Sequence, residues 1–71
     1  MYEKHIVRAD FYPNGQIIPL GFTDDSGKTF YVNRILSVSY KKTGEEIVRC
    51  IISNRKHTFV LKNNKWRIYV D

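Results

Sequence analysis

Apolar residues recur at every second position along most of this chain, and such alternation is typical of β-strands with one buried face. The residues that share a face in the successive stretches are Val7, Ala9 and Phe11; Ile18, Leu20 and Phe22; Phe30 and Val32; Leu36, Val38 and Tyr40; Val48, Cys50 and Ile52; Phe59 and Leu61; and Trp66, Ile68 and Val70. No window of ten or more residues follows the 3.6-residue period of a helix. The pattern predicts a chain of short strands.

Residues that favour tight turns separate these stretches. The turn signals are Pro13-Asn14-Gly15, Asp24-Asp25-Ser26-Gly27, Lys42-Thr43-Gly44, Asn54-Arg55-Lys56 and Asn63-Asn64-Lys65. Strands joined by such short turns pair with their neighbours in sequence as an antiparallel meander. Pro19 has no N–H to give to a ladder, so we expect its strand to lie at an edge or to bend there.

These strands predict an all-β fold, a small SH3-like barrel or a strongly curled antiparallel meander of five to six strands. A sandwich of two full sheets would need more than 71 residues, and closure into a barrel removes exposed edge strands. A chain of this length buries only about 60% of the surface that its unfolded form exposes. Its 42% of hydrophobic residues still suffice for one packed core, so we expect residues 1–71 to form a single small domain.

The predicted core contains the apolar side chains of the inward faces together with the lone cysteine. Cys50 has no second cysteine to pair with, and it alternates with Val48 and Ile52, so we expect a buried free thiol that behaves as a small hydrophobe. The predicted core residues are Val7, Phe11, Leu20, Phe30, Val32, Val38, Cys50, Ile52, Phe59, Leu61, Trp66 and Ile68.

Five segments carry a resemblance to other proteins. They are Gly15-Gln16-Ile17-Ile18-Pro19-Leu20, Phe30-Tyr31-Val32-Asn33-Arg34-Ile35, Ile47-Val48-Arg49-Cys50-Ile51-Ile52, Thr58-Phe59-Val60-Leu61 and Trp66-Arg67-Ile68-Tyr69. Together they resemble a family of small uncharacterised bacterial β proteins with an SH3-like fold. This chain has Arg67 where other members tend to have an aromatic residue directly after the tryptophan. The family has no assigned activity, so the resemblance implies a fold and assigns no functional residues.

Positive charge is concentrated in the second half of the chain. The net charge is +5, but residues 1–33 hold three basic and four acidic residues, whereas residues 34–71 hold nine basic and three acidic residues. The two halves therefore carry −1 and +6. A basic bias in one half favours a surface that faces an anionic partner; the alternative is a solvated surface that only promotes solubility.

Aromatic residues lie among these basic residues, and the combination favours nucleic-acid binding. Arg67 and Tyr69 alternate with the apolar residues of the last strand, and Arg49 does so in an earlier one, so the three share an exposed surface if their strands are neighbours. Guanidinium and ammonium groups neutralise phosphates, and tyrosine rings stack with bases. The candidate nucleic-acid-binding residues are Arg34, Lys41, Lys42, Arg49, Arg55, Lys56, Arg67 and Tyr69.

Protein interaction is the second function class that the pattern leaves open. Ile47 and Ile51 lie off the Cys50 face of their strand, and Ile17 adds a further apolar residue. More apolar surface than one core can use favours a dimer interface or the addition of a partner's strand. The candidate interaction residues are therefore Ile17, Ile47 and Ile51, with another protein or a second copy of the chain as the partner.

Catalytic and metal chemistry find little support in the residue pattern. Only Cys50 with His5 or His57 could form a thiol–imidazole pair, and Cys50 lies within an apolar strand. The two histidines lack the spacing of metal ligands, and the four glycines are scattered singly, so no phosphate-binding loop can be drawn. We therefore expect no enzyme activity, no catalytic residues, no metal and no cofactor.

The chain also lacks the apolar segments that membranes require. No apolar run approaches the roughly 20 residues that cross a bilayer, and residues 1–5 do not open an apolar signal segment. We expect no membrane contact and a cytoplasmic location, with which a single thiol agrees.

Overall fold

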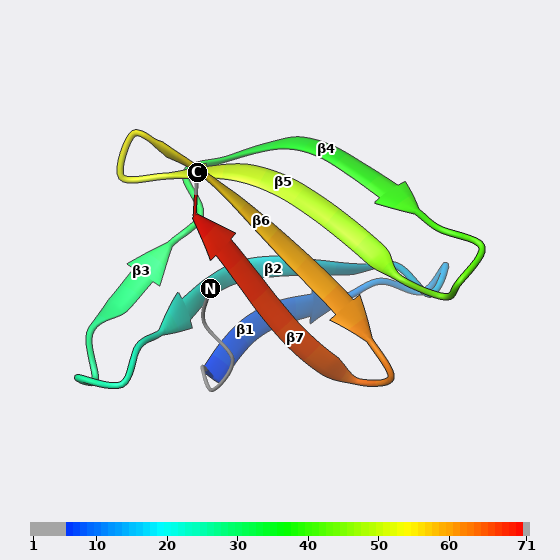
Figure 1. The fold of residues 1–71 in the computed structure, drawn as a ribbon, viewed down its shortest axis with the longest axis horizontal. Coiled ribbons are helices and arrows are strands. Elements are labelled where there is room, and N and C mark those ends of the chain that lie inside the picture. The colour runs from blue at the N-terminus through cyan, green and yellow to red at the C-terminus, as the bar shows by residue number, and fades with distance from the viewer. Residues whose placement is uncertain (1–5, 71) are drawn as a thin grey trace.

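Seven β-strands make up the part of the chain that the computed structural model describes, residues 6–70 (Figure 1). They are β1 (Ile6–Phe11), β2 (Ile17–Thr23), β3 (Thr29–Tyr31), β4 (Arg34–Tyr40), β5 (Glu46–Ile52), β6 (Arg55–Lys62) and β7 (Lys65–Val70). The all-β prediction is confirmed. The strand count over these residues exceeds the predicted five to six, and Thr29–Tyr31 and Arg34–Tyr40 are separate strands that belong to different sheets. Within the same range, no helix is long and apolar enough to cross a membrane.

The strands form two antiparallel sheets in which each strand pairs with its neighbour in sequence. The order is β1-β2-β3 in a sheet of three strands and β4-β5-β6-β7 in a sheet of four, with β7 and β6 crossing in front of β1 and β2 in Figure 1. The predicted meander is therefore present twice. Two sheets fit into so short a chain because the strands are only three to eight residues long.

The chain passes from one sheet to the other at Val32 and Asn33. The N–H of Val32 donates to the carbonyl oxygen of Leu20 in β2 at 2.8 Å, and the N–H of Asn33 donates to that of Ile51 in β5, also at 2.8 Å. The side-chain oxygen of Asn33 then accepts the N–H of Ser53 at 2.9 Å. Two successive residues thus bond to different sheets, and this joint holds the sheets at a defined relative position.

Two-residue turns connect β5 to β6 and β6 to β7. The residues of both turns, 53–54 and 63–64, have positive φ angles, as the type I′ hairpin turn requires. Turns of this kind set the register of the strands that they join. Lys62 therefore pairs directly with Lys65, and Arg55 is already the first residue of β6.

The hydrophobic core lies between the two sheets. Phe22 of β2 contacts Phe59 of β6 edge to face, with ring centroids 6.1 Å apart, so aromatic rings join the sheets. Trp66 packs edge to face on the same Phe59, with centroids 5.9 Å apart. The buried core residues are Phe22, Val48, Cys50, Ile52, Phe59 and Ile68, and the half-buried residues packed against them are Val7, Phe30, Val32, Ile35, Val38 and Trp66.

Two predicted core residues, Phe11 and Leu20, are exposed instead. A β-bulge in the β1–β2 ladder leaves Leu20 as the extra residue, 44% exposed, and its place in the core is taken by Phe22. Phe11 is 78% exposed because it is the last residue of β1, next to the turn at residues 12–16. The bulge also accommodates Pro19, which is buried in a central strand that bends rather than at a sheet edge.

Candidate nucleic-acid interface

Strand alternation gives the four-stranded sheet one face that points away from the core. Val48, Cys50 and Ile52 point inward from β5, so the residues between them point outward, and the pairing of the strands places the outward residues of β4, β6 and β7 beside them. We call this surface the outer face. Its residues are Arg34, Ser37, Ser39, Ile47, Arg49, Ile51, Lys56, Thr58, Val60, Lys62, Lys65, Arg67 and Tyr69.

The outer face carries positive charge alone. Of its strand positions, all of which lie in the described part of the chain, six hold Lys or Arg and none holds Asp or Glu. All six basic residues are exposed. Glu46 does not offset them, because it pairs with Leu61 on the inward side and is only 7% exposed. An anion that approaches this face therefore meets no opposing carboxylate from the strands.

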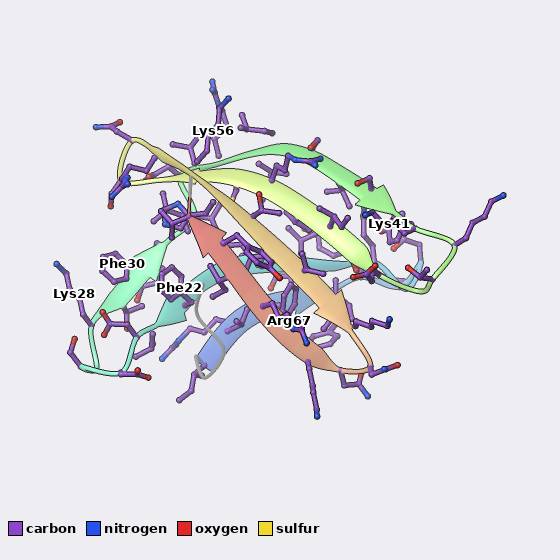
Figure 2. The ribbon with its side chains drawn as sticks, viewed as in Figure 1. Phe22, Lys28, Phe30, Lys41, Lys56 and Arg67 are labelled. Carbon is purple, nitrogen blue, oxygen red and sulfur yellow. The ribbon has the colours of Figure 1, made fainter. Side chains whose placement is uncertain are left out.

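A groove of about 590 Å³ crosses the end of the outer face. It runs between the β4–β5 turn and the β6–β7 turn. Figure 2 shows Lys41 near the β4–β5 turn and Arg67 on β7. The lining residues are Lys41, Glu45, Val60, Lys62, Asn63, Lys65, Arg67 and Tyr69. Four cations thus face one carboxylate, that of Glu45, which also accepts the hydroxyl of Thr43 at 2.9 Å.

Two of these cations, Lys62 and Lys65, lie directly opposite each other across the β6–β7 ladder. Like charges at such cross-strand positions repel and destabilise a sheet. Both side chains are exposed, so water and salt weaken the repulsion, but directly paired residues lie closer together than the screening length of about 10 Å at 0.1 M salt. An anion bound between the two side chains would remove this repulsion.

Most of the residues predicted from the sequence lie together. The structure places Arg49, Arg67 and Tyr69 on the outer face, as their alternation predicts, and Arg34 and Lys56 lie on the same face. Lys41 lines the groove, and Lys42 is exposed in the adjoining turn. Figure 2 shows Lys41 and Lys56 at opposite ends of the sheet, so the cations extend along its whole length.

Arg55 is the exception among the predicted binding residues. The turn between β5 and β6 consists of Ser53 and Asn54 alone, so Arg55 pairs with Ile52 and belongs to the inward side. It lines a second cavity of about 210 Å³ between the ends of the two sheets. The other residues that line this cavity are Phe22, Asp24, Phe30, Ile52, Ser53, His57 and Val70.

Lys62 and Lys65 are the outer-face cations that the candidate set omitted. The sequence does indicate their position, because a two-residue turn at Asn63 and Asn64 places the flanking residues, Lys62 and Lys65, opposite each other in the hairpin. Counting back by two from Arg67 then puts Lys65 on the same face.

The three isoleucines predicted as an interaction surface do not all lie on one sheet. Ile47 is on the outer face but only 8% exposed, because it lies on a central strand between Ser39 and Val60. Ile51 is half-buried on the same face. Ile17 is half-buried in the other sheet, where its N–H donates to the carboxyl of Glu46.

The thiol and imidazole that could have formed a catalytic pair are neighbours in the structure. Cys50 and His57 pair across the β5–β6 ladder, but the thiol donates to the carbonyl oxygen of His57 at 3.7 Å. Burial raises the pKa of Cys50 to about 11, so its thiol stays protonated at neutral pH. His5 lies outside the described residues. Among residues 6–70, no group of three or more His, Cys, Asp or Glu side chains could hold a metal ion.

The fold and its outer face define a small two-sheet β protein with one strongly basic sheet surface. No family model, curated protein or solved structure matches this chain. The resemblance to the family of small bacterial β proteins, and the SH3-like barrel that it implies, therefore stay predictions.

Proposed function

We propose that this protein is a non-catalytic module that binds nucleic acid through the outer face of the β4–β7 sheet. One observation carries the proposal: six exposed cations occupy this face without a carboxylate among them, and two of these cations are paired against their mutual repulsion. Phosphates of a nucleic-acid backbone supply the repeated negative charge that such an array neutralises. Single-site anion binding would not need cations along the length of the sheet.

Binding of this kind depends on salt in a predictable way. Each neutralised phosphate releases a condensed counterion, so the logarithm of the affinity falls linearly with the logarithm of the salt concentration. If about four phosphates of a single strand are contacted, the slope is near −3, and affinity falls roughly 50-fold between 50 and 200 mM salt.

Fluorescence anisotropy with labelled oligonucleotides at several salt concentrations tests the proposal. Arg67→Gln removes a groove cation and is expected to weaken binding and to lower the salt slope by about one unit or less. Arg8→Gln is the matched control, because Arg8 is an exposed strand arginine on the other sheet. Absence of binding at low salt, an affinity that ignores salt, or equal effects of the two substitutions would contradict the proposal.

Self-association is the second candidate function, and exposed apolar side chains favour it. All of them in the described chain lie on β1 to β4 or in the turn after β1, which leaves the outer face of β5 to β7 free of them. They are Ile6, Phe11, Tyr12, Leu20, Tyr31, Leu36 and Tyr40. Sedimentation analysis should then show a dimer that Leu36→Ser weakens, whereas a monomer at high concentration excludes self-association.

We also propose a cytoplasmic location. Cys50 is a free cysteine held in the core, and free thiols persist in reducing compartments. Microscopy of a tagged protein in the cells that make it would test this, and a signal outside the cytoplasm would contradict it.

A further inference from the structure

We propose that the nucleic acid bound by the outer face is single-stranded, with one nucleotide seated in the groove so that its base stacks on Tyr69 and its phosphates contact Lys62, Lys65 and Arg67. This inference rests on the proposed function and names the form of the ligand. It follows from the mixed character of the groove, which is not a uniformly charged surface.

The groove combines an apolar floor with a charged rim. Val60 lies on the central strand β6, and Tyr69 is its diagonal neighbour on β7; both are half-buried and both line the groove. Around them Lys62, Lys65 and Arg67 are exposed. A base is a flat and largely apolar ring that is linked to a phosphate, so its two parts match the floor and the rim.

The size and the polar lining of the groove suit a nucleotide unit. Its volume of about 590 Å³ falls within the roughly 300–1,000 Å³ that small-molecule sites occupy. The amide of Asn63 lies at the groove, where it can donate to or accept from the edge of a base. A tyrosine platform accepts any base, because every base has a flat π-face.

Duplex DNA does not make use of these features. Its bases are stacked inside the helix, so only phosphates and groove edges reach a protein. A duplex would contact the cations at the rim and leave Val60 and Tyr69 without a partner. Reading of a duplex groove needs a helix or a two-stranded ribbon that enters it, whereas the residues of the outer face belong to strands within a four-stranded sheet.

The decisive experiment compares a labelled 12-nucleotide single strand with a duplex of the same length at one salt concentration. We expect the single strand to bind at least tenfold more tightly. Tyr69→Leu should weaken single-strand binding roughly 5- to 150-fold, the range for loss of one stacked base, and should leave the salt slope unchanged since no charge is removed. Tyr69→Phe keeps the ring and should retain binding. Tyr31→Leu, at an exposed tyrosine of the other sheet, is the matched control.

A second measurement uses the unaltered chain, so that a folding defect in a Tyr69 variant cannot obscure the result. Photocrosslinking of a single strand that contains halogenated pyrimidines should join the oligonucleotide to Tyr69. Equal affinity for both forms, crosslinks confined to other residues, or unchanged binding by folded Tyr69→Leu would overturn the single-strand inference and leave the proposed function standing. Failure of both single strand and duplex to bind at low salt would overturn the proposed function itself.

Discussion

The two sheets present opposite kinds of surface to solvent. The three-stranded sheet and its turns expose large apolar side chains such as Phe11 and Tyr31, and their few cations, Arg8 and Lys28, are outnumbered by acidic residues. The four-stranded sheet exposes six cations on its outer face, and its exposed large apolar side chains, Leu36 and Tyr40, are confined to the edge strand β4. Charge that served solubility alone would be most useful beside the apolar surface. Its segregation to the other sheet is what favours a specific anionic partner.

The sheets differ outside but share one interior. The contact between Phe22 and Phe59 crosses from one sheet to the other, and so does the hydrogen bond from the N–H of Ile17 to the carboxyl of Glu46. Together with the joint at Val32 and Asn33, these contacts predict that neither sheet is stable without the other. Stability experiments can therefore test whether the two sheets unfold together, and binding experiments can distinguish the functions of their two surfaces.

The largest effect is expected from Phe59→Ala. The ring of Phe59 is fully buried and contacts both Phe22 and Trp66, so its removal should lower the free energy of unfolding by about 3–5 kcal/mol. Urea unfolding followed by Trp66 fluorescence and by circular dichroism measures this loss. Because the core is shared, the two signals should change together; separate transitions would show that the sheets unfold independently.

A smaller loss is expected where β2 and β3 approach most closely. A Cβ atom added at Gly21 would lie 2.3 Å from the backbone carbonyl oxygen of Phe30, so one of the strands must shift. We expect Gly21→Ala to lower the free energy of unfolding by about 1–3 kcal/mol, the usual range for overpacking. Gly15→Ala provides no equivalent clash, because nothing lies within 4 Å of its added Cβ, although its positive φ adds some strain. A Gly21→Ala variant as stable as the wild type would contradict the close approach.

Local pattern predicted the four-stranded sheet better than the three-stranded one, for a physical reason. In β5 to β7 the ladders are regular, so alternation correctly placed Cys50, Arg49 and Arg67. In β1 and β2 a bulge breaks the alternation, and Leu20 was assigned to the wrong side. Bulges depend on how two strands pair, which the pattern of a single strand does not reveal.

The candidate site shows the same division. The face of a residue was predictable where the length of the preceding turn was predictable. Arg55 was misplaced because the turn ends at Asn54, two residues before the end of the turn predicted at residues 54–56. The groove was not predictable, because Lys41 and Tyr69 come together only through the order of four strands. Burial of Glu46 between the sheets likewise has no local signal.

Glu46 should make the contact between the sheets dependent on pH. Burial raises the pKa of its carboxyl above the usual 4.5, against a smaller lowering by the N–H of Ile17, and its Oε2 has no hydrogen-bond partner among the described residues. The folded state therefore binds this proton more tightly than the unfolded state. The contribution of Glu46 to stability is greatest below pH 4.5 and declines as the pH rises through 4.5 and the raised folded pKa.

Glu46→Gln tests this dependence because it keeps an acceptor for Ile17 and removes the charge. When the pH is lowered from 7 to 4, the free energy of unfolding of the wild type should change more favourably than that of the variant, because the variant lacks the titrating carboxyl. Glu45→Gln is the control, because it removes one carboxylate charge at the neighbouring residue, in the β4–β5 turn. Identical pH profiles for wild type and Glu46→Gln would mean that the buried carboxyl does not link protonation to stability.

The smallest expected effect is the most informative about the outer face. Lys65→Gln relieves the repulsion with Lys62 across the β6–β7 ladder, so it should raise the free energy of unfolding by a few tenths of a kcal/mol at low salt. The gain should shrink in 1 M salt, where the screening length falls to about 3 Å. Lys56→Gln is the control on the same face, because Lys56 pairs with the uncharged Ile51. Both substitutions should weaken nucleic-acid binding, but only Lys65→Gln should stabilise the protein. A lysine pair that lowers stability while it raises affinity is what a surface selected for binding requires; equal stabilities of the two variants at low salt would remove that argument.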